Sequence, residues 1–245
     1  MILVYIIAFT LIGSILSLFG SLFLLLKQKI TQDFSQKLIS FAAGALIATA
    51  FLDLLPEAAE LKEGSQIFLF SLLGFVSFFF AEKYIRLFHY HHGHGEKPST
   101  LLVLAGDGIH NFVDGVAIAV AFLVSIPLGI VTTIAVASHE IPQEIADMGV
   151  LLANGLPKAR ALIFNFLSAV TALIGAIGAF LLAGRIEGYL YIFLAVAAGH
   201  FIYIAASDLI PELHEKSRGK RDFGSILIFV LGILTIYASS LIFEA

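Results

Sequence analysis

Long apolar runs separated by short polar segments dominate this chain. Eight of the runs are long enough to cross a lipid bilayer, which takes about 20 apolar residues in a helix. They lie near Ile2–Leu26, Leu38–Pro56, Gln66–Ala81, Thr100–Ile126, Pro127–Asn154, Ala159–Ala183, Tyr189–Ile210 and Phe223–Phe243. None alternates apolar and polar residues as a barrel strand does, and helices satisfy their own backbone hydrogen bonds in lipid. We therefore expect an all-α integral membrane protein with eight transmembrane helices in a single transmembrane domain, residues 1–245.

Composition agrees with this expectation. Hydrophobic residues make up 59% of the chain and charged residues only 13%, and the mean hydropathy is +0.98. A soluble domain of this length needs far more polar surface. The chain contains no cysteine, which excludes disulfides and thiolate metal ligands. The first run lacks the basic start and cleavage site of a signal peptide, so we expect it to remain as a helix.

The distribution of positive charge predicts the orientation in the membrane. Twelve of the 14 Lys and Arg residues fall in the segments after the first, third, fifth and seventh runs, and only Lys62 and Arg185 lie on the other side. Cytoplasmic loops carry the excess of Lys and Arg in membrane proteins. We therefore expect a multi-pass protein of the cell membrane with both termini outside the cytoplasm.

An internal repeat relates the second and seventh runs. The second run contains Asp53-Leu-Leu-Pro-Glu57, and the seventh contains Asp208-Leu-Ile-Pro-Glu212, 155 residues later. The two copies cross the membrane in opposite directions, and inverted repeats of this kind are typical of secondary transporters. The repeat predicts a 3+2+3 arrangement, in which helices 1–3 and 6–8 flank a central fourth and fifth helix.

Two polar clusters interrupt the central helices, at about residues 100–154. The fourth run carries Asp107, His110, Asn111 and Asp114, and the fifth carries His139, Glu140, Gln143, Glu144 and Asp147. Ionisable side chains at membrane depth cost several kcal/mol unless they are partnered, so such residues are functional candidates. Imidazole, carboxylate and carboxamide together form a ligand set for a divalent cation. A polar network that only joins two helices is the alternative interpretation.

Helical spacing favours the metal interpretation. His110 and Asp114 are four residues apart, so both can reach one ion, and Asn111 and Asp114 can share a second. On the next helix, His139 and Gln143 are also four residues apart. These helices are therefore predicted to form a metal-binding core.

The motifs Gly106-Asp-Gly-Ile-His-Asn-Phe-Val-Asp-Gly115 and His139-Glu-Ile-Pro-Gln-Glu144 resemble those of the ZIP family of zinc/iron-regulated metal transporters. The resemblance covers the full chain and includes Asn165-Phe-Leu-Ser168. It implies a binuclear metal site midway through the membrane and uptake toward the cytoplasm.

Carried over by position, the resemblance implies two sets of metal ligands that share Asp114 as a bridge. One set is His110, Asp114, His139 and Gln143, and the other is Asn111, Asp114, Glu140 and Asn165. Relatives often have His or Glu where this chain has Gln143, and a neutral amide is the weaker ligand.

Further residues are candidates for a metal pathway. These are Asp53, Glu57, Asp107, Glu144, Asp147, His200, Asp208 and Glu212. A solvated helix-end carboxylate is an equally good interpretation of several of them. A loop between the third and fourth runs carries His89, His91, His92 and His94, either as metal-gathering residues or as an inconsequential solvated loop.

Other function classes share some of these features. His139-Glu140-Ile-Pro-Gln143 comes within one residue of the H-E-x-x-H motif, so an intramembrane zinc-dependent hydrolase using His139 and Glu140 is the rival hypothesis. The missing second His argues against an enzyme, and a channel stays open as a third class. The expected partners are divalent metal ions and the bilayer, with no nucleic acid and no resident cofactor. Imidazole with carboxylate suits Zn²⁺ best, and also Fe²⁺, Mn²⁺, Co²⁺ and Cd²⁺. The sequence leaves open whether the protein forms a homodimer.

Overall fold

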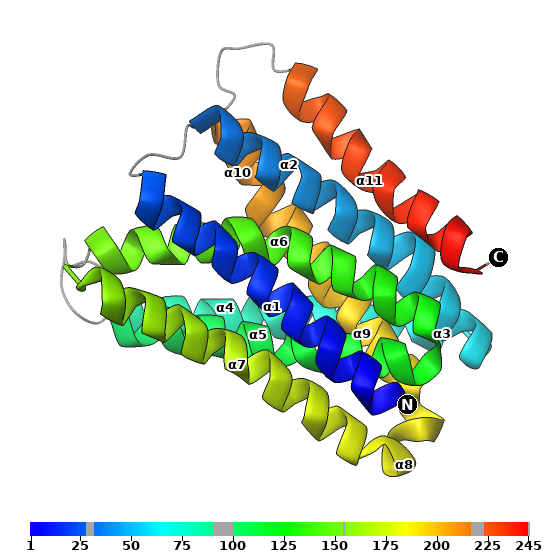
Figure 1. The fold of residues 1–245 in the computed structure, drawn as a ribbon. Coiled ribbons are helices and arrows are strands. Elements are labelled where there is room, and N and C mark those ends of the chain that lie inside the picture. Colours follow the sequence, from blue (N-terminus) through cyan, green and yellow to red (C-terminus); the bar gives the residue numbers. More distant parts are fainter. Residues whose placement is uncertain (28–31, 91–99, 154, 217–222, 245) are drawn as a thin grey trace.

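A computed structural model describes residues 1–27, 32–90, 100–153, 155–216 and 223–244, and these form a bundle of helices (Figure 1). The long helices are α1 (Ile2–Lys27), α2 (Gln32–Ala48), α4 (Gln66–Tyr90), α5 (Thr100–Val124), α6 (Ile126–Ala153), α7 (Lys158–Leu181), α9 (Leu190–Tyr203) and α11 (Phe223–Glu244). Shorter elements are η1 (Thr49–Leu54), α3 (Leu55–Leu61), α8 (Ala183–Ile186), η2 (Glu187–Tyr189), η3 (Ile204–Leu209) and α10 (Ile210–Lys216). The described residues contain no strand, so the expected all-α class is confirmed.

Several helices extend beyond the runs that the sequence predicts. The second helix begins at Gln32 instead of Leu38, and the third continues to Tyr90 instead of Ala81. Apolar runs report only the part of a helix that lies in hydrocarbon. The helix itself continues into the polar interface, where long charged side chains can reach water.

Seven segments of the described chain are apolar and long enough to cross a membrane, and α6 is not among them. This helix is 28 residues long, which is ample for a bilayer. Its middle carries His139, Glu140, Gln143 and Glu144, which lower its hydropathy. The hydropathy of α6 is therefore lower than that of these seven segments because α6 holds part of the candidate metal centre.

Two π-helical segments occupy equivalent positions of the repeat. The amide of Leu55 donates to the carbonyl of Ala50, and the amide of Ile210 donates to the carbonyl of Ala205, each five residues back. Both segments are followed directly by a proline-containing turn, at Pro56 and in the second copy 155 residues later. Proline lacks an amide hydrogen and clashes with the preceding turn, and a wider turn accommodates both effects. The repeat therefore extends from sequence to backbone geometry.

The helices pack in pairs, α2 against α11, α4 against α9, α1 against α6 and α5 against α7. The α5–α7 pair is held especially close, because a Cβ at Gly115 would lie 1.8 Å from the Ala172 carbonyl oxygen and one at Gly175 would lie 2.2 Å from that of Phe112. Figure 1 shows both termini at the same end of the bundle, near α3 and α8. The α5–α7 pair and α6 enclose the polar residues of the central helices.

Candidate metal centre

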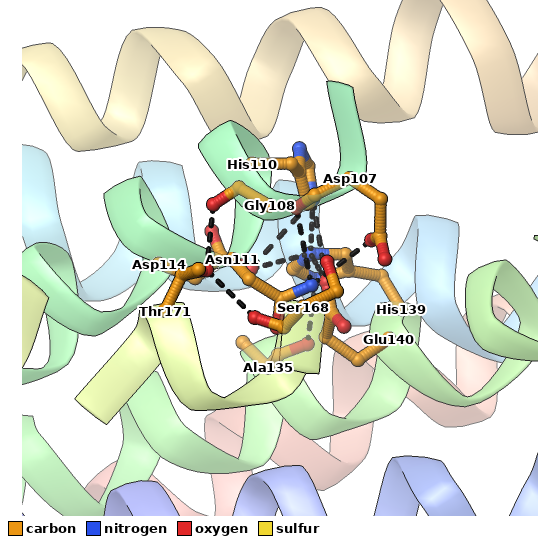
Figure 2. Close-up of polar contacts among 10 residues, drawn as sticks. All are labelled: Asp107, Gly108, His110, Asn111, Asp114, Ala135, His139, Glu140, Ser168 and Thr171. Atoms are coloured by element: carbon orange, nitrogen blue, oxygen red, sulfur yellow. Dashed lines mark hydrogen bonds and ion pairs between the residues drawn. The ribbon is translucent and has the colours of Figure 1, made fainter. Parts of the chain in front are cut away.

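The polar faces of α5 and α6 meet inside the bundle, and α7 closes the side (Figure 2). On α5, Asp107, His110, Asn111 and Asp114 share one face because they are three or four residues apart. All four are at least nine-tenths buried. Helical periodicity therefore gathers the ligand-type side chains that the sequence singled out.

Four side chains form the first ligand group: His110, Asp114, His139 and Glu140, whose ligand atoms all lie within 4.8 Å of one another. The two Nε2 atoms of His110 and His139 are 3.1 Å apart. The Nε2 atom of His139 lies 3.0 Å from Asp114 Oδ2, and that of His110 lies 3.4 Å from Glu140 Oε1. Imidazole nitrogens and carboxylate oxygens thus converge on one point, which is the arrangement that a divalent cation requires.

A backbone contact orients one of these imidazoles. The Nδ1 atom of His139 lies 3.2 Å from the carbonyl oxygen of Ala135, which can only accept, so Nδ1 carries the hydrogen. In the neutral ring the lone pair is then on Nε2, which faces the other ligands. Metal-binding histidines are commonly fixed by such a hydrogen bond from the second ring nitrogen.

Three carboxylates form a second group: Asp107, Glu140 and Glu144, again within 4.8 Å of one another. Glu140 therefore belongs to both groups, while Asp114 belongs to the first alone. The Asn111 amide donates to Asp107 Oδ1 at 2.9 Å, and the Asn165 amide donates to the backbone carbonyl of Glu144 at 3.3 Å. These bonds aim the two carboxamides toward the second group.

No lysine or arginine lies near the carboxylates of this centre in the sequence. Residues 98–157 contain no Lys or Arg, although they hold Asp107, Asp114, Glu140 and Glu144. Glu140 is 3% exposed, and neither of its oxygens accepts a hydrogen bond from a described residue. Buried carboxylates this close together are costly unless a cation or protons neutralise them. The centre is therefore suited to bind positive charge.

The remaining predicted ligand, Gln143, lies beside Asp107 on the side of the second group. Its side chain is half-buried. The sequence reasoning gave no role to two hydroxyl residues of α7: Ser168, which lies beside Asp107, and Thr171, whose Oγ1 donates to the Gly108 carbonyl at 2.6 Å. Ser168 is three residues from Asn165, and this helical spacing was the available signal.

The candidate pathway residues are dispersed. Asp53 is buried and accepts a hydrogen bond from Ser240, whereas Glu57, Asp147 and Asp208 are half-buried. His200 contacts Ser77 on α4. His89 lies in the last turn of α4 and Glu212 lies on α10, and nothing further is described for their side chains. His91, His92 and His94 lie outside the described residues.

Comparison with known proteins identifies the family. The profile described as "ZIP Zinc transporter" matches residues 1–100 and 89–240. The chain is 42% identical over 146 residues to "Metal cation symporter ZIP14" of Xenopus tropicalis, covering 58% of this chain and 31% of that protein. It is 42% identical over 151 residues to "Zinc transporter ZIP10" of Homo sapiens, covering 58% and 18%.

A third relative, "Zinc transporter foi" of Drosophila melanogaster, is 38% identical over 143 residues, covering 56% of this chain and 20% of that protein. The chain thus spans less than a third of the length of these relatives. The family profile, in contrast, extends over nearly the whole of this chain. With its helical bundle and buried His, Asp and Glu cluster, this chain belongs to the ZIP family of metal transporters.

Proposed function

We propose that this protein moves divalent transition-metal cations across a membrane, with Zn²⁺ as the principal substrate. The observation that carries the proposal is the convergence of two imidazole Nε2 atoms and two carboxylates inside an otherwise apolar bundle. Zinc binds this combination of nitrogen and oxygen ligands well. The names of the relatives, zinc transporters and metal cation symporters, support the same activity.

We further propose that the centre holds two ions. The first lies among His110, Asp114, His139 and Glu140, and the second lies at Asp107, Glu140 and Glu144 beside the amides of Asn111 and Asn165. This assignment makes Glu140 the bridge, where the family resemblance implied Asp114. It also moves Gln143 from the first ion to the neighbourhood of the second, because Gln143 lies beside Asp107.

The proposed architecture is the 3+2+3 arrangement, with α1–α4 and α7–α11 as inverted copies around α5 and α6. Support comes from the matched π-helical segments and from the pairing of helices. In this arrangement α1 corresponds to α7, α2 to α9, α4 to α11 and α5 to α6. The packed pair α2–α11 then corresponds to the packed pair α9–α4, and α1–α6 corresponds to α7–α5. Such inverted repeats favour alternating access around a site at mid-membrane.

The proposed direction is uptake into the cytoplasm, with both termini outside. The excess of Lys and Arg on one side supports this orientation, and Figure 1 shows both termini at one end of the bundle. A homodimer is part of the same proposal, and light scattering of the purified protein tests it.

The hydrolase hypothesis has less support. A zinc hydrolase keeps a metal position open to water, with a general base beside it. Here Glu140 belongs to both ligand groups, and the second histidine of the H-E-x-x-H motif is replaced by Gln143. A transporter therefore accounts for the site better than an enzyme.

Purified protein in liposomes tests the proposal. We expect Zn²⁺ or Cd²⁺ to move down its gradient without ATP, and competing Mn²⁺, Fe²⁺ and Co²⁺ to slow it to different degrees. Liposomes that contain the Asp114→Ala variant provide the matched control. Absence of protein-dependent metal flux, together with hydrolysis of a membrane substrate, would favour the enzyme.

A further inference from the structure

A third imidazole, His200 of α9, lies beside the metal centre without belonging to either ligand group. Its Nε2 atom is 3.2 Å from Ser77 Oγ of α4, and its Nδ1 atom is buried with no hydrogen-bond partner among the described residues. A buried polar atom without a partner costs free energy and calls for an explanation.

The hydrogen-bond pattern decides which nitrogen of His200 carries the lone pair. Ser77 Oγ donates its single hydrogen to the Gly74 carbonyl at 2.8 Å. It can therefore only accept from His200, so His200 Nε2 is the donor. In the neutral ring Nδ1 is left as an unprotonated, unpartnered nitrogen, which is the form in which imidazole binds a metal ion.

The internal repeat shows that helix packing does not require a histidine at this position. The offset of 155 relates His200 of α9 to Ala45 of α2. The facing helices, α4 and α11, correspond at an offset of 158, because Cβ atoms at Gly74 and Gly232 would each lie 2.3 Å from backbone carbonyl oxygens that are 155 residues apart. Ser77 therefore corresponds to Thr235, and the α2–α11 pair has a hydroxyl and an alanine where the α4–α9 pair has a hydroxyl and a histidine. The second copy has an imidazole that the first copy packs without.

One aromatic ring contacts both His200 and the metal centre. The Phe78 centroid lies 5.2 Å from the ring of His200 and 5.5 Å from the ring of His110, which it meets edge to face. One turn along α9 from His200, Tyr203 also contacts Phe78 and donates a hydrogen bond to Glu82 of α4. His200, Tyr203 and Glu82 thus form a line of polar side chains between α4 and α9, and Phe78 lies between this line and the metal centre.

We propose that His200 is a transfer ligand, which accepts a Zn²⁺-like ion from His110 through Nδ1 when the Phe78 ring moves aside. The proposal rests on the transport function above and adds a metal position to it. One imidazole holds such an ion more weakly than two imidazoles with two carboxylates, so the ion can leave again. Successive weak sites are what permeation through a membrane protein requires.

A cysteine substitution tests binding at this position directly, because the chain has no cysteine of its own. His200→Cys places a single thiol there, and Cd²⁺ bound to a thiolate shows an ultraviolet charge-transfer band. We expect the band in His200→Cys on titration with Cd²⁺, and no band in the matched control Ala45→Cys. Adding Phe78→Ala to His200→Cys should make the band appear faster.

The metal content of the same samples separates the two proposals. Cadmium in the wild-type protein without a band in His200→Cys overturns the transfer ligand and leaves the transport function intact. Wild-type protein that binds no cadmium at all contradicts the transport function itself.

Transport kinetics provide an independent test. The double variant His200→Ala/Ser77→Thr carries the residues that the α2–α11 pair has at the equivalent positions, so it should fold and keep its equilibrium affinity for Zn²⁺ at the main centre. Its maximal rate should fall about tenfold, the usual minimum for loss of a metal-site partner. His200→Gln retains a group that can bond Ser77 but is a poor zinc ligand, and it should be slow as well. Full turnover in His200→Gln would show that His200 has only a structural role.

Discussion

At the scale of single residues, the centre depends on a few side chains whose charge is neutralised only by what they bind. Glu140 lies 3.4 Å from His110 Nε2 and 3.7 Å from His139 Nε2, and it also belongs to the three-carboxylate group. Asp114, in contrast, contacts the two histidines from one side. Substitutions at these two positions therefore distinguish a bridging ligand from a ligand of one ion.

The first prediction compares Glu140→Gln with Asp114→Asn, which preserve shape and remove one charge each. Glu140→Gln should lose both ions, whereas Asp114→Asn should lose the first ion and keep the second. Transport should fall to background in both variants, because each leaves the first group short of a carboxylate. Mass spectrometry of bound metal in the purified proteins measures the stoichiometry. Loss of two ions in Asp114→Asn alone would restore Asp114 as the bridge.

A second prediction concerns Gln143, which lies beside Asp107. Gln143→His adds an imidazole next to the three-carboxylate group, and imidazole favours Zn²⁺ over Mn²⁺ more than oxygen ligands do. Competition in liposomes should therefore shift toward Zn²⁺, with a lower maximal rate because a tightly held ion leaves slowly. Gln143→Glu, which adds an oxygen ligand instead, serves as the control. An unchanged ion ranking in both variants would place Gln143 away from the ions.

At the scale of elements, close contact between α5 and α7 positions the second ligand group. The two helices meet through Gly115 and Gly175, which allow backbone to approach backbone. That approach brings Asn165 and Ser168 of α7 to Glu144 and Asp107. The geometry of the centre therefore depends on residues with no chemistry of their own.

The third prediction tests this dependence with Gly115→Ala. The added Cβ would meet the Ala172 carbonyl at 1.8 Å, so the helices must separate. Overpacking of this kind costs about 1–3 kcal/mol, which should lower the melting temperature and weaken metal binding together. Gly178→Ala on α7 is the matched control, because its added Cβ would meet no described atom within 4 Å. Equal melting temperatures for the two variants would contradict the close contact.

At the scale of the whole molecule, the repeat and the charge distribution together predict how the protein sits in the membrane. The α3–α4 turn and the start of α7 lie at opposite ends of the bundle, since α4, α5 and α6 connect them with three crossings. Glu63, in that turn, and Lys158, at the start of α7, are both exposed. A label attached at either position therefore reports one side of the membrane.

The fourth prediction uses single cysteines at these positions. A membrane-impermeant thiol reagent added to intact cells should label Glu63→Cys and leave Lys158→Cys unlabelled, because Lys158 lies on the basic side. Permeabilised cells should label both variants, which controls for reactivity. The reverse pattern would invert the proposed orientation and, with it, the direction of uptake.

The sequence determined which segments are helices, the polar faces of α5 and α6, and the repeat between Asp53 and Asp208. Each of these is a local property, because hydrophobic length, helical periodicity and a fixed offset can be read along one chain. The sequence did not predict the helix end at Tyr90, because an apolar run ends at the hydrocarbon boundary whereas the helix continues past that boundary.

Tertiary structure decided how the polar faces meet. Only the rotation and depth of the packed helices place Glu140 in both ligand groups, turn Gln143 toward Asp107 and bring His200 to Ser77. The π-helical turns that recur 155 residues apart likewise depend on backbone hydrogen bonds five residues long, which no residue type specifies alone. The sequence therefore identifies the candidate ligand residues. Which of them converge on one ion depends on distances between helices, and these are fixed by close packing at positions such as Gly115.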